Sequence, residues 1–416
     1  MRRADDGLVT ALKDTSSNDA VAQIRRANAG REPQRLAMKY RAMRGSGFAF
    51  LRGTCALFYD RLPRGGLFKS APPVWVCGDL HLENFGSYRG DNGLAYFDIN
   101  DFDEAVLAPA SWDLVRLLTS AQVATEEMGL PASRRNGIGE ALLEAYAAAL
   151  RSGKSLWVER DTATGLVRQL LESVSSRKRA EFLDSRTVVA GKKRTLRIDG
   201  AKALAIDAHE RALVAEFMRD FAAAQPDPAF YRMIDVARRI AGTGSLGLDR
   251  YVVLVRGKGS PDGNHLLDLK VAERSALAPT LKLAQPRWKT QAHRIAELQR
   301  REQAVSVAFL RPVLLGERPF VLRALQPAQD RVDIARASAE QLEQLVASMG
   351  QLVAWSHLRS AGRAGSADAD ALIVFGQRKK WKHALQEAAG SCAARVREDA
   401  AVFNAAYDAG AFERQT

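Results

Sequence analysis

Cys77-Gly78-Asp79-Leu80-His81-Leu82-Glu83-Asn84 decides the fold, and Asn100-Asp101-Phe102-Asp103 follows it after one further apolar run. Val74-Trp75-Val76 directly precedes the first segment and predicts a short buried strand. Leu94-Ala95-Tyr96-Phe97, reached through a turn-rich stretch, predicts a second strand ahead of the other segment. The two acidic segments should therefore lie at the ends of buried strands, where polar side chains are placed for chemistry.

The spacing of Asp79 and Asn84 matches what phosphoryl transfer requires. That reaction needs a carboxylate to accept the proton of the attacking hydroxyl, oxygen ligands for magnesium, and cations on the triphosphate. Kinases put the first group and one metal ligand on a single loop with the spacing D-L-x-x-x-N. Asp79 is then the expected base and Asn84 a magnesium ligand. Alone the pair is a weak signal, because an aspartate and an asparagine five residues apart are common.

The acidic run after the second strand predicts the other metal ligand. Carboxylate oxygens suit magnesium, which takes only one or two protein carboxylates and keeps several waters. Several carboxylates beside a buried strand repel one another unless a cation is present. We expect Asp101 to chelate the metal, with Asp98 as the second candidate. A solvated acidic turn is the alternative.

These motifs carry a resemblance to known enzymes. Gly78–Asn84 resembles the G-D-x-H-x-x-N catalytic loop of aminoglycoside phosphotransferase-like and choline-kinase-like proteins, and Asp101–Ala105 resembles their I-D-F-x-x-A segment. Asp113-Leu114-Val115 resembles the D-L-A at the start of their next helix. The resemblance implies an α+β, protein-kinase-like fold of two lobes with a largely helical large lobe. It also implies that His81 belongs with Asp79 in the catalytic loop, and that Asp113 braces that loop.

The whole chain also resembles a bacterial family known only as a domain of unknown function. Phe48–Gly53, Arg179–Asp184 and Asp235–Arg239 carry this second resemblance. It implies a fold but no substrate.

The expected nucleotide-binding residues come late in the chain. Gly242, Gly244, Ser245 and Gly247 form a G-x-G-S-x-G loop before the valine-rich strand 251–255, where a strand rather than a helix disfavours a dinucleotide site. Backbone N–H groups of such a loop can bind phosphates, although the motif alone is weak.

A lysine for the phosphates is expected on the strand that comes next. Lys270 ends the strand 266–271, where the phosphate-binding lysine of a kinase belongs. Glu297 on the following helix is its expected partner, with Glu302 and Glu273 as rivals. An edge-strand lysine that discourages aggregation is the alternative for Lys270.

In this chain the expected catalytic loop comes before the expected nucleotide-binding residues, the reverse of the usual kinase order. This order predicts a circular permutation of a kinase-like fold. Residues 1–77 should form a helical segment on the large lobe, with 18–45 as one helix and Phe48–Gly53 as a strand or tight turn. Residues 78–232 should hold the catalytic loop, metal hairpin and large lobe, 233–332 the small β lobe, and 333–416 a helical return. Permutation is tolerable because domain termini often lie close together. It fails if Lys270 lies more than roughly 12 Å from Asp101, because both must reach one triphosphate.

The expected function is an ATP- and magnesium-dependent phosphotransferase with an unknown small-molecule or protein acceptor. The rival is a metal-dependent phosphoesterase, which would use Gly78-Asp79-Leu80-His81 together with Gly263-Asn264-His265, although about 180 residues separate them and no bridging aspartate motif intervenes. A kinase-like protein that transfers AMP, or that binds nucleotide without transfer, is the other alternative.

The composition limits which partners and which cellular location we expect. The formal charge of +13 suits an anionic partner such as a nucleotide, but it also suits a basic soluble protein, and without a recognition module nucleic acid is an unlikely partner. Apolar runs are too short for a membrane span, so we expect no membrane association. Three distant cysteines and a start, Met1–Asp6, without an apolar leader indicate a reducing cytoplasm.

Overall fold

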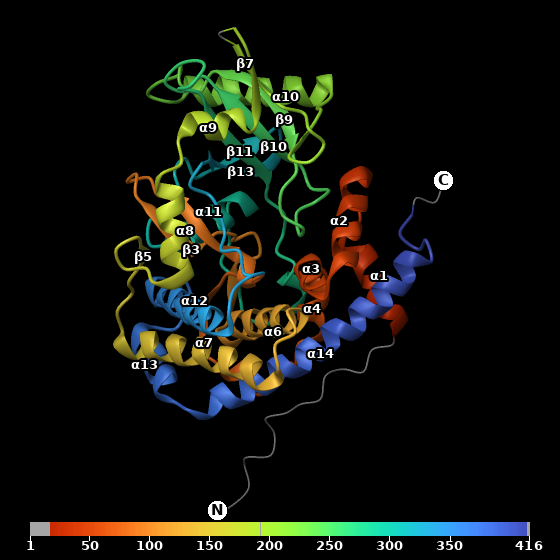
Figure 1. Cartoon of the computed structure of the whole chain (residues 1–416), viewed down its shortest axis with the longest axis vertical. Coiled ribbons are helices and arrows are strands. Elements are labelled where there is room, and N and C mark those ends of the chain that lie inside the picture. Colours follow the sequence, from red (N-terminus) through yellow and green to blue (C-terminus); the bar gives the residue numbers. More distant parts are fainter. Residues whose placement is uncertain (1–16, 192, 414–416) are drawn as a thin grey trace, which may run out of the picture.

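The computed structural model describes residues 17–191 and 193–413. The start of the chain, on which the absence of a secretory leader was predicted, lies outside these residues. Helices gather in the lower part of Figure 1, and an antiparallel sheet with its covering helices forms the upper part. The predicted α+β class is confirmed. None of the helices in the described ranges is long and apolar enough to cross a bilayer.

The helical part contains most of the buried apolar side chains, in one continuous core. Helices α7 and α14 pack against α6, whose side chains are buried along almost its whole length, and α12 packs against α7. The helices of this part are α1 (Ser17–Ala27), α2 (Pro33–Gly45), α3 (Gly47–Gly53), α4 (Cys55–Arg61), α5 (Leu67–Ser70), α6 (Ser111–Glu127), α7 (Ala132–Ser152), α8 (Gly165–Ser175), α12 (Ala339–Arg359), α13 (Ala369–Gln377) and α14 (Lys380–Asp408).

Two local predictions near the N-terminus were wrong. Residues 18–45 form two helices, because Gly30 adopts a φ of +76° and the Glu32 carboxylate caps α2 by accepting from the next backbone N–H groups. Residues 48–53 are helical in α3, which begins where the Ser46 hydroxyl accepts a hydrogen bond from Ala49 N. A short apolar run does not distinguish a strand from a buried helix.

Short antiparallel strands position the two acidic segments. β1 (Pro73–Val76) pairs with β4 (Val106–Pro109), and Val76 lies opposite Val106. The loops that leave β1 and enter β4 therefore lie side by side. A short 3-10 turn, Leu82–Asn84, ends the first loop. The remaining strands here are β2 (Phe85–Arg89), β3 (Ala95–Ile99) and β5 (Val158–Glu159).

The upper part is a six-stranded antiparallel sheet with the order β12-β13-β11-β10-β9-β8. Helix α10 (Ala208–Ala223) covers one face with Val214 and Met218. Helix α9 (Arg179–Asp184) and the hairpin β6–β7 (Thr187–Ala190, Lys193–Leu196) cover the other with Leu183 and Leu196. The strands are β8 (Ala203–Leu204), β9 (Met233–Arg239), β10 (Arg250–Val255), β11 (His265–Val271), β12 (Arg311–Leu315) and β13 (Arg318–Leu325).

The sheet unit does not coincide with residues 233–332. Strand β8 and helix α10 precede residue 233 and belong to the sheet. Helix α11 (Gln291–Glu302) lies between β11 and β12 in the chain, yet its Ile295 and Leu298 pack into the core of the helical part. Helix α11 therefore connects the two parts.

Candidate functional site

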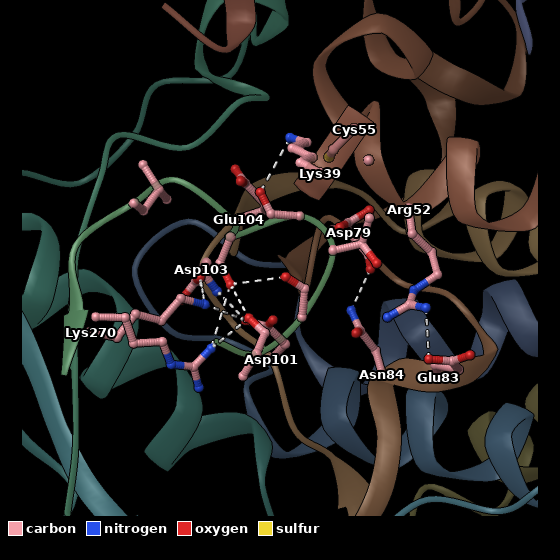
Figure 2. Close-up of a pocket in the computed structure, with 18 of the residues that line it drawn as sticks. Lys39, Arg52, Cys55, Asp79, Glu83, Asn84, Asp101, Asp103, Glu104 and Lys270 are labelled. Atoms are coloured by element: carbon pink, nitrogen blue, oxygen red, sulfur yellow. Dashed lines mark hydrogen bonds and ion pairs between the residues drawn. The ribbon is translucent and has the colours of Figure 1, made fainter. Parts of the chain in front are cut away.

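A cavity of about 350 Å³ lies between the helical part and the sheet. Most of its lining comes from four stretches of chain, within residues 23–57, 79–104, 239–270 and 323–331, to which Arg186 and Ala276 add. Most of the predicted site residues meet in it, although they lie far apart in the sequence (Figure 2). Those lining the cavity are Asp79, His81, Asn84, Asp101, Gly242, Gly244, Ser245 and Lys270.

The loop that carries Asp79 is held by a buried carboxylate on α6. Asp113 accepts hydrogen bonds from Cys77 N (2.8 Å) and Gly78 N (2.9 Å), and Tyr59 donates its hydroxyl proton to Gly78 O. Gly78 has a φ of +88°, and a Cβ there would lie 2.5 Å from Glu104 O. Only glycine allows the two acidic segments to approach this closely. The bracing role predicted for Asp113 is confirmed.

Arg116, which the sequence analysis missed, contacts the expected base directly. Its Nε and Nη2 donate to Asp79 Oδ1 at 3.1 and 2.5 Å. The guanidinium is fully buried, lies 4.6 Å from the centre of the Phe58 ring, and also donates to Leu51 O. The ion pair fixes the orientation of the Asp79 carboxylate. An arginine one turn after Asp113, in an otherwise apolar stretch, was the signal for it.

Asn84 is oriented by the same loop. Its Nδ2 donates to Asp79 O at 2.5 Å, and its backbone O accepts from Asn100 N at 2.8 Å. Because the amide nitrogen is used, the side-chain oxygen remains as a ligand.

His81 has a different environment. It lines the cavity with its ring edge-on to Phe48, and its buried Nδ1 has no hydrogen-bond partner among the described residues. Burial, followed by the charges of Arg52, Arg116 and Arg331, holds the pKa of His81 well below its ordinary value. The ring is therefore neutral at physiological pH.

Lys270 and the acidic segment meet at the other end of the cavity. Lys270 Nζ forms an ion pair with Asp103 and lies 3.8 Å from Asp101 Oδ1. Burial alone would raise the pKa of Asp101, but Lys270, Arg323 and Arg250 hold it below its ordinary value. Burial, and then the charge of Asp101, raise the pKa of Asp103. Of the two aspartates, Asp101 is therefore the one that ionises more readily.

The donor set fits magnesium. Within residues 17–191 and 193–413, no group of three or more His, Cys, Asp or Glu side chains is arranged to hold a metal ion. One carboxylate, on Asp101, and one amide oxygen, on Asn84, face the same cavity. Magnesium commonly takes so few protein ligands when it also binds substrate phosphates. Soft-metal sites rich in cysteine or histidine are not what these residues offer.

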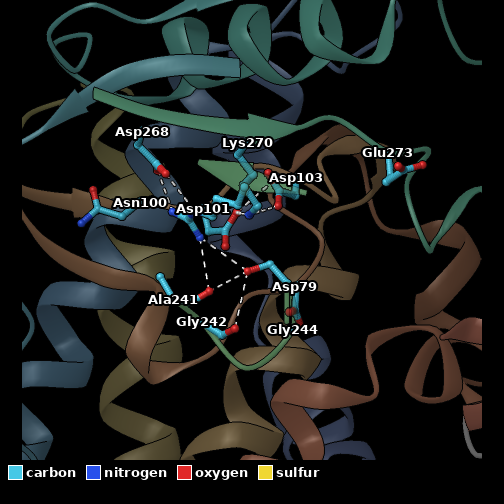
Figure 3. Close-up of polar contacts among 12 residues, drawn as sticks. Asp79, Asn100, Asp101, Asp103, Ala241, Gly242, Gly244, Asp268, Lys270 and Glu273 are labelled. Carbon is cyan, nitrogen blue, oxygen red and sulfur yellow. Dashed lines mark hydrogen bonds and ion pairs between the residues drawn. The ribbon is translucent and has the colours of Figure 1, made fainter. Parts of the chain in front are cut away.

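The sheet presents a positively charged surface to the cavity. Figure 3 shows Asp268 and Lys270 projecting from the same strand, β11, toward Asp101 and Asp103. Asp268 is buried and contacts three guanidinium groups, which hold its pKa well below the ordinary value although burial opposes this. Burial, with the charge of Arg250, lowers the pKa of Arg239 to about 9. The ion pairs of Asp268 join Arg239 (2.6 Å), Arg250 (2.6 Å) and Arg323 (3.3 Å).

The glycine loop between β9 and β10 is docked on the N-terminal helices. Arg31 Nη1 donates to both Gly244 O and Leu246 O at 2.7 Å, and Arg35 Nη1 donates to Leu248 O at 2.5 Å. These contacts use the carbonyl groups of the loop. Ser245 Oγ donates to Ala241 O at 2.8 Å, within the loop itself. The sequence analysis did not predict that residues 23–57 line the cavity, because they carry no motif that indicates phosphate or metal binding.

Three predicted site residues lie elsewhere. Asp98 is buried behind the cavity, where it accepts from Ala304 N and lies 3.6 Å from Arg359, so it joins elements of the core and is not a metal ligand. Gly247 does not line the cavity, and its carbonyl accepts from Glu32 N (2.9 Å).

Glu297 does not pair with Lys270. It pairs with Arg301 instead, because the apolar face of α11 turns into the core and leaves Glu297 outside. Neither rival, Glu302 nor Glu273, pairs with Lys270 either: Glu302 is buried against Ser356, and Glu273 lies near Arg318.

The residues of the phosphoesterase alternative are not brought together. Asn264 bonds to backbone oxygens of the turn between β10 and β11, and His265 packs against Phe230. Neither lines the cavity that contains His81.

The comparisons with known proteins give a family. Residues 31–406 match the model of a family described as an uncharacterized protein conserved in bacteria (DUF2252). The chain belongs to this family. No curated protein and no solved structure matches the chain.

Proposed function

We propose that this DUF2252 protein is an ATP- and magnesium-dependent phosphotransferase with a circularly permuted, kinase-like arrangement, acting on a hydroxyl or amine acceptor. One observation carries the proposal. Lys270 and Asp101 come from distant parts of the chain, yet Lys270 Nζ lies 3.8 Å from Asp101 Oδ1 in the cavity that contains Asp79. This is well within the roughly 12 Å that a shared triphosphate allows.

The order of elements in the sheet supports the same conclusion. A glycine loop joins β9 and β10, which follow β8 in the chain, and the lysine lies on the next strand, β11. Helix α11 and two more strands follow. In kinases the glycine-rich loop and the lysine on the third strand occur in this order. The catalytic loop, which normally comes afterwards, precedes them here.

Each group has a place in the reaction. Asp79 would accept the acceptor's proton, with its carboxylate oriented by Arg116. Lys270 and N–H groups of the loop 242–245 would bind the phosphates. Asn84 and Asp101 would hold magnesium, which neutralises phosphate charge when bound. The three cysteines are free, which suits the reducing cytoplasm that we propose as its location.

Nucleotide binding tests the proposal. We expect ATP with magnesium to raise the melting temperature, since a ligand at 100 times its Kd stabilises by about 2.7 kcal/mol. Asp101→Asn and Lys270→Met should each remove most of this shift, whereas the exposed control Asp370→Asn should keep it.

Two results would count against the proposal. One is an ATP shift that does not depend on magnesium, and the other is a shift that survives in both variants. Mass spectrometry of a modified acceptor separates phosphoryl transfer from AMP transfer.

A further inference from the structure

The cavity has a second compartment beside Asp79, which we call the N-terminal chamber. Figure 2 shows Lys39 and Cys55 on one side of Asp79, and Asn84 and Asp101 on the other. Helices α1, α2 and α4, with the short segments between them, form its wall. Its lining includes Gln23, Ile24, Asn28, Lys39, Cys55 and Leu57. A group in this chamber approaches Asp79 from the side away from the expected metal ligands.

Lys39 is the unusual residue of the chamber. Its side chain is only 2% exposed, and its ammonium donates to two neutral oxygens, Asn28 Oδ1 (2.7 Å) and Gly244 O (3.3 Å). No carboxylate of the described residues lies within 4.0 Å of it, and one of its three N–H groups has no partner among those residues. Arg31, beside it, likewise bonds to carbonyl groups of the glycine loop.

Other buried cationic side chains among the described residues have a carboxylate partner or more hydrogen bonds than Lys39. Arg61 pairs with Asp399 at 3.1 Å, and Arg194 pairs with Asp184 and Asp262. Arg294 has no carboxylate partner, but each of its nitrogens donates a hydrogen bond. A protonated Lys39 is thus neither ion-paired nor fully hydrogen-bonded, an arrangement that costs free energy unless an anion joins it.

The carboxylates near Lys39 have other partners. The charged and titratable groups facing it are Arg31, Asp79, Cys55 and Glu104. Asp79 pairs with Arg116, and Glu104 accepts from Ala276 N at 2.5 Å. Burial, and then Arg31, lower the pKa of Lys39 well below its ordinary value. A cationic ligand would add to this positive charge, whereas an anionic ligand would offset it.

We propose that the N-terminal chamber binds the acceptor, and that the acceptor carries a carboxylate or phosphate group held by Lys39. This inference rests on the phosphotransferase function proposed above. The acceptor's hydroxyl oxygen forms a bond to the γ-phosphorus as the bond from that phosphorus to the ADP oxygen breaks. The hydroxyl proton goes to the Asp79 carboxylate, and ADP leaves with the electron pair. Lys39 holds the anionic group and takes no proton in this step.

Small anions can test the chamber by themselves. The full chain is first saturated with magnesium and the non-hydrolysable analogue AMPPNP, which fills the donor phosphate positions. Inorganic phosphate, acetate and ethanolamine are then titrated by calorimetry. We expect phosphate or acetate to bind and ethanolamine not to bind. Lys39→Met should weaken anion binding at least tenfold while AMPPNP affinity stays within twofold, and Lys39→Arg should retain the anion.

The exposed Lys69→Met is the matched control and should bind like the wild type. Equal anion affinity in wild type and Lys39→Met, no anion binding to the loaded protein, or preferential ethanolamine binding would overturn the inference. Loss of AMPPNP affinity in Lys39→Met would assign the lysine to the donor instead. If AMPPNP does not bind the wild type, the phosphotransferase proposal fails. Phosphate titrated into the free protein then still tests the chamber, because its affinity should fall in Lys39→Met and persist in the exposed control Lys69→Met.

Discussion

Replacing Gly78 with alanine tests the close approach between the two acidic segments. Gly78 and Gly93 have nearly the same positive φ, +88° and +86°. Alanine at either position therefore has the same conformational cost, about 1–2 kcal/mol. The surroundings differ, because a Cβ at residue 93 meets nothing within 4 Å, whereas at residue 78 it lies 2.5 Å from Glu104 O and 2.9 Å from Glu104 C. Both are backbone atoms that cannot rotate away.

The steric clash adds about 1–3 kcal/mol, which is typical of overpacking. We expect Gly78→Ala to lower the free energy of unfolding by about 2–5 kcal/mol, and Gly93→Ala by about 1–2 kcal/mol. Urea denaturation followed by the fluorescence of the six tryptophans measures both, as a shift of midpoint at constant slope. Equal losses in the two variants would refute the packing of residue 104 against residue 78.

Two further predictions concern the loop that carries Asp79 and the acidic segment beside it. Asp113→Asn leaves one acceptor oxygen for the N–H groups of Cys77 and Gly78, so one buried donor loses its partner and stability should fall by about 1–3 kcal/mol in urea denaturation. The exposed Asp370→Asn should change it by less than about 0.5 kcal/mol, and similar losses in both would contradict the bracing role. Burial, and then the charges of Asp79 and Asp103, raise the pKa of Glu104 from 4.5 to about 7, so ionising it destabilises the folded state as pH rises between those values. Glu104→Gln should gain stability relative to wild type between pH 5 and pH 8, by up to about 3 kcal/mol, and a pH-independent difference would exclude this titration.

The sequence predicted the acidic half of the site better than its surroundings. The strands before Asp79 and Asp101 follow from local patterns that the structure confirms. The bracing by Asp113 was implied by the resemblance to kinase-like enzymes, and its hydrogen bonds confirm it. The predicted strand 266–271 gave the position of Lys270 in the sheet. Its proximity to Asp101 was expected because both residues must reach the same triphosphate. The contacts that residues on helices make with the site could not be predicted in this way. Arg116 reaches Asp79 and Glu297 turns away from Lys270 because of how α6 and α11 rotate against the core, which spacing along the chain does not specify.

The N-terminal wall was missed for a related reason. Arg31 and Lys39 contact the carbonyl groups of a loop more than 200 positions later in the chain. Such a contact depends on backbone atoms that any sequence provides, so no motif marks it. Asp98 shows the reverse error, since an acidic residue in a suggestive place proved to be hydrogen-bonded within the core.

The docking of the glycine loop on α2 and on the turn before it has a consequence for synthesis of the protein. Helix α2 and the turn before it cannot complete these contacts until residues 244–248 have been translated, and the cavity also needs residues 323–331. Contacts between such distant positions slow folding, because the intervening chain must be ordered before they form. The nascent chain therefore carries Arg31, Arg35 and Lys39 without their loop partners while more than 200 further residues are added. The cavity therefore cannot be complete before residue 331 has been translated.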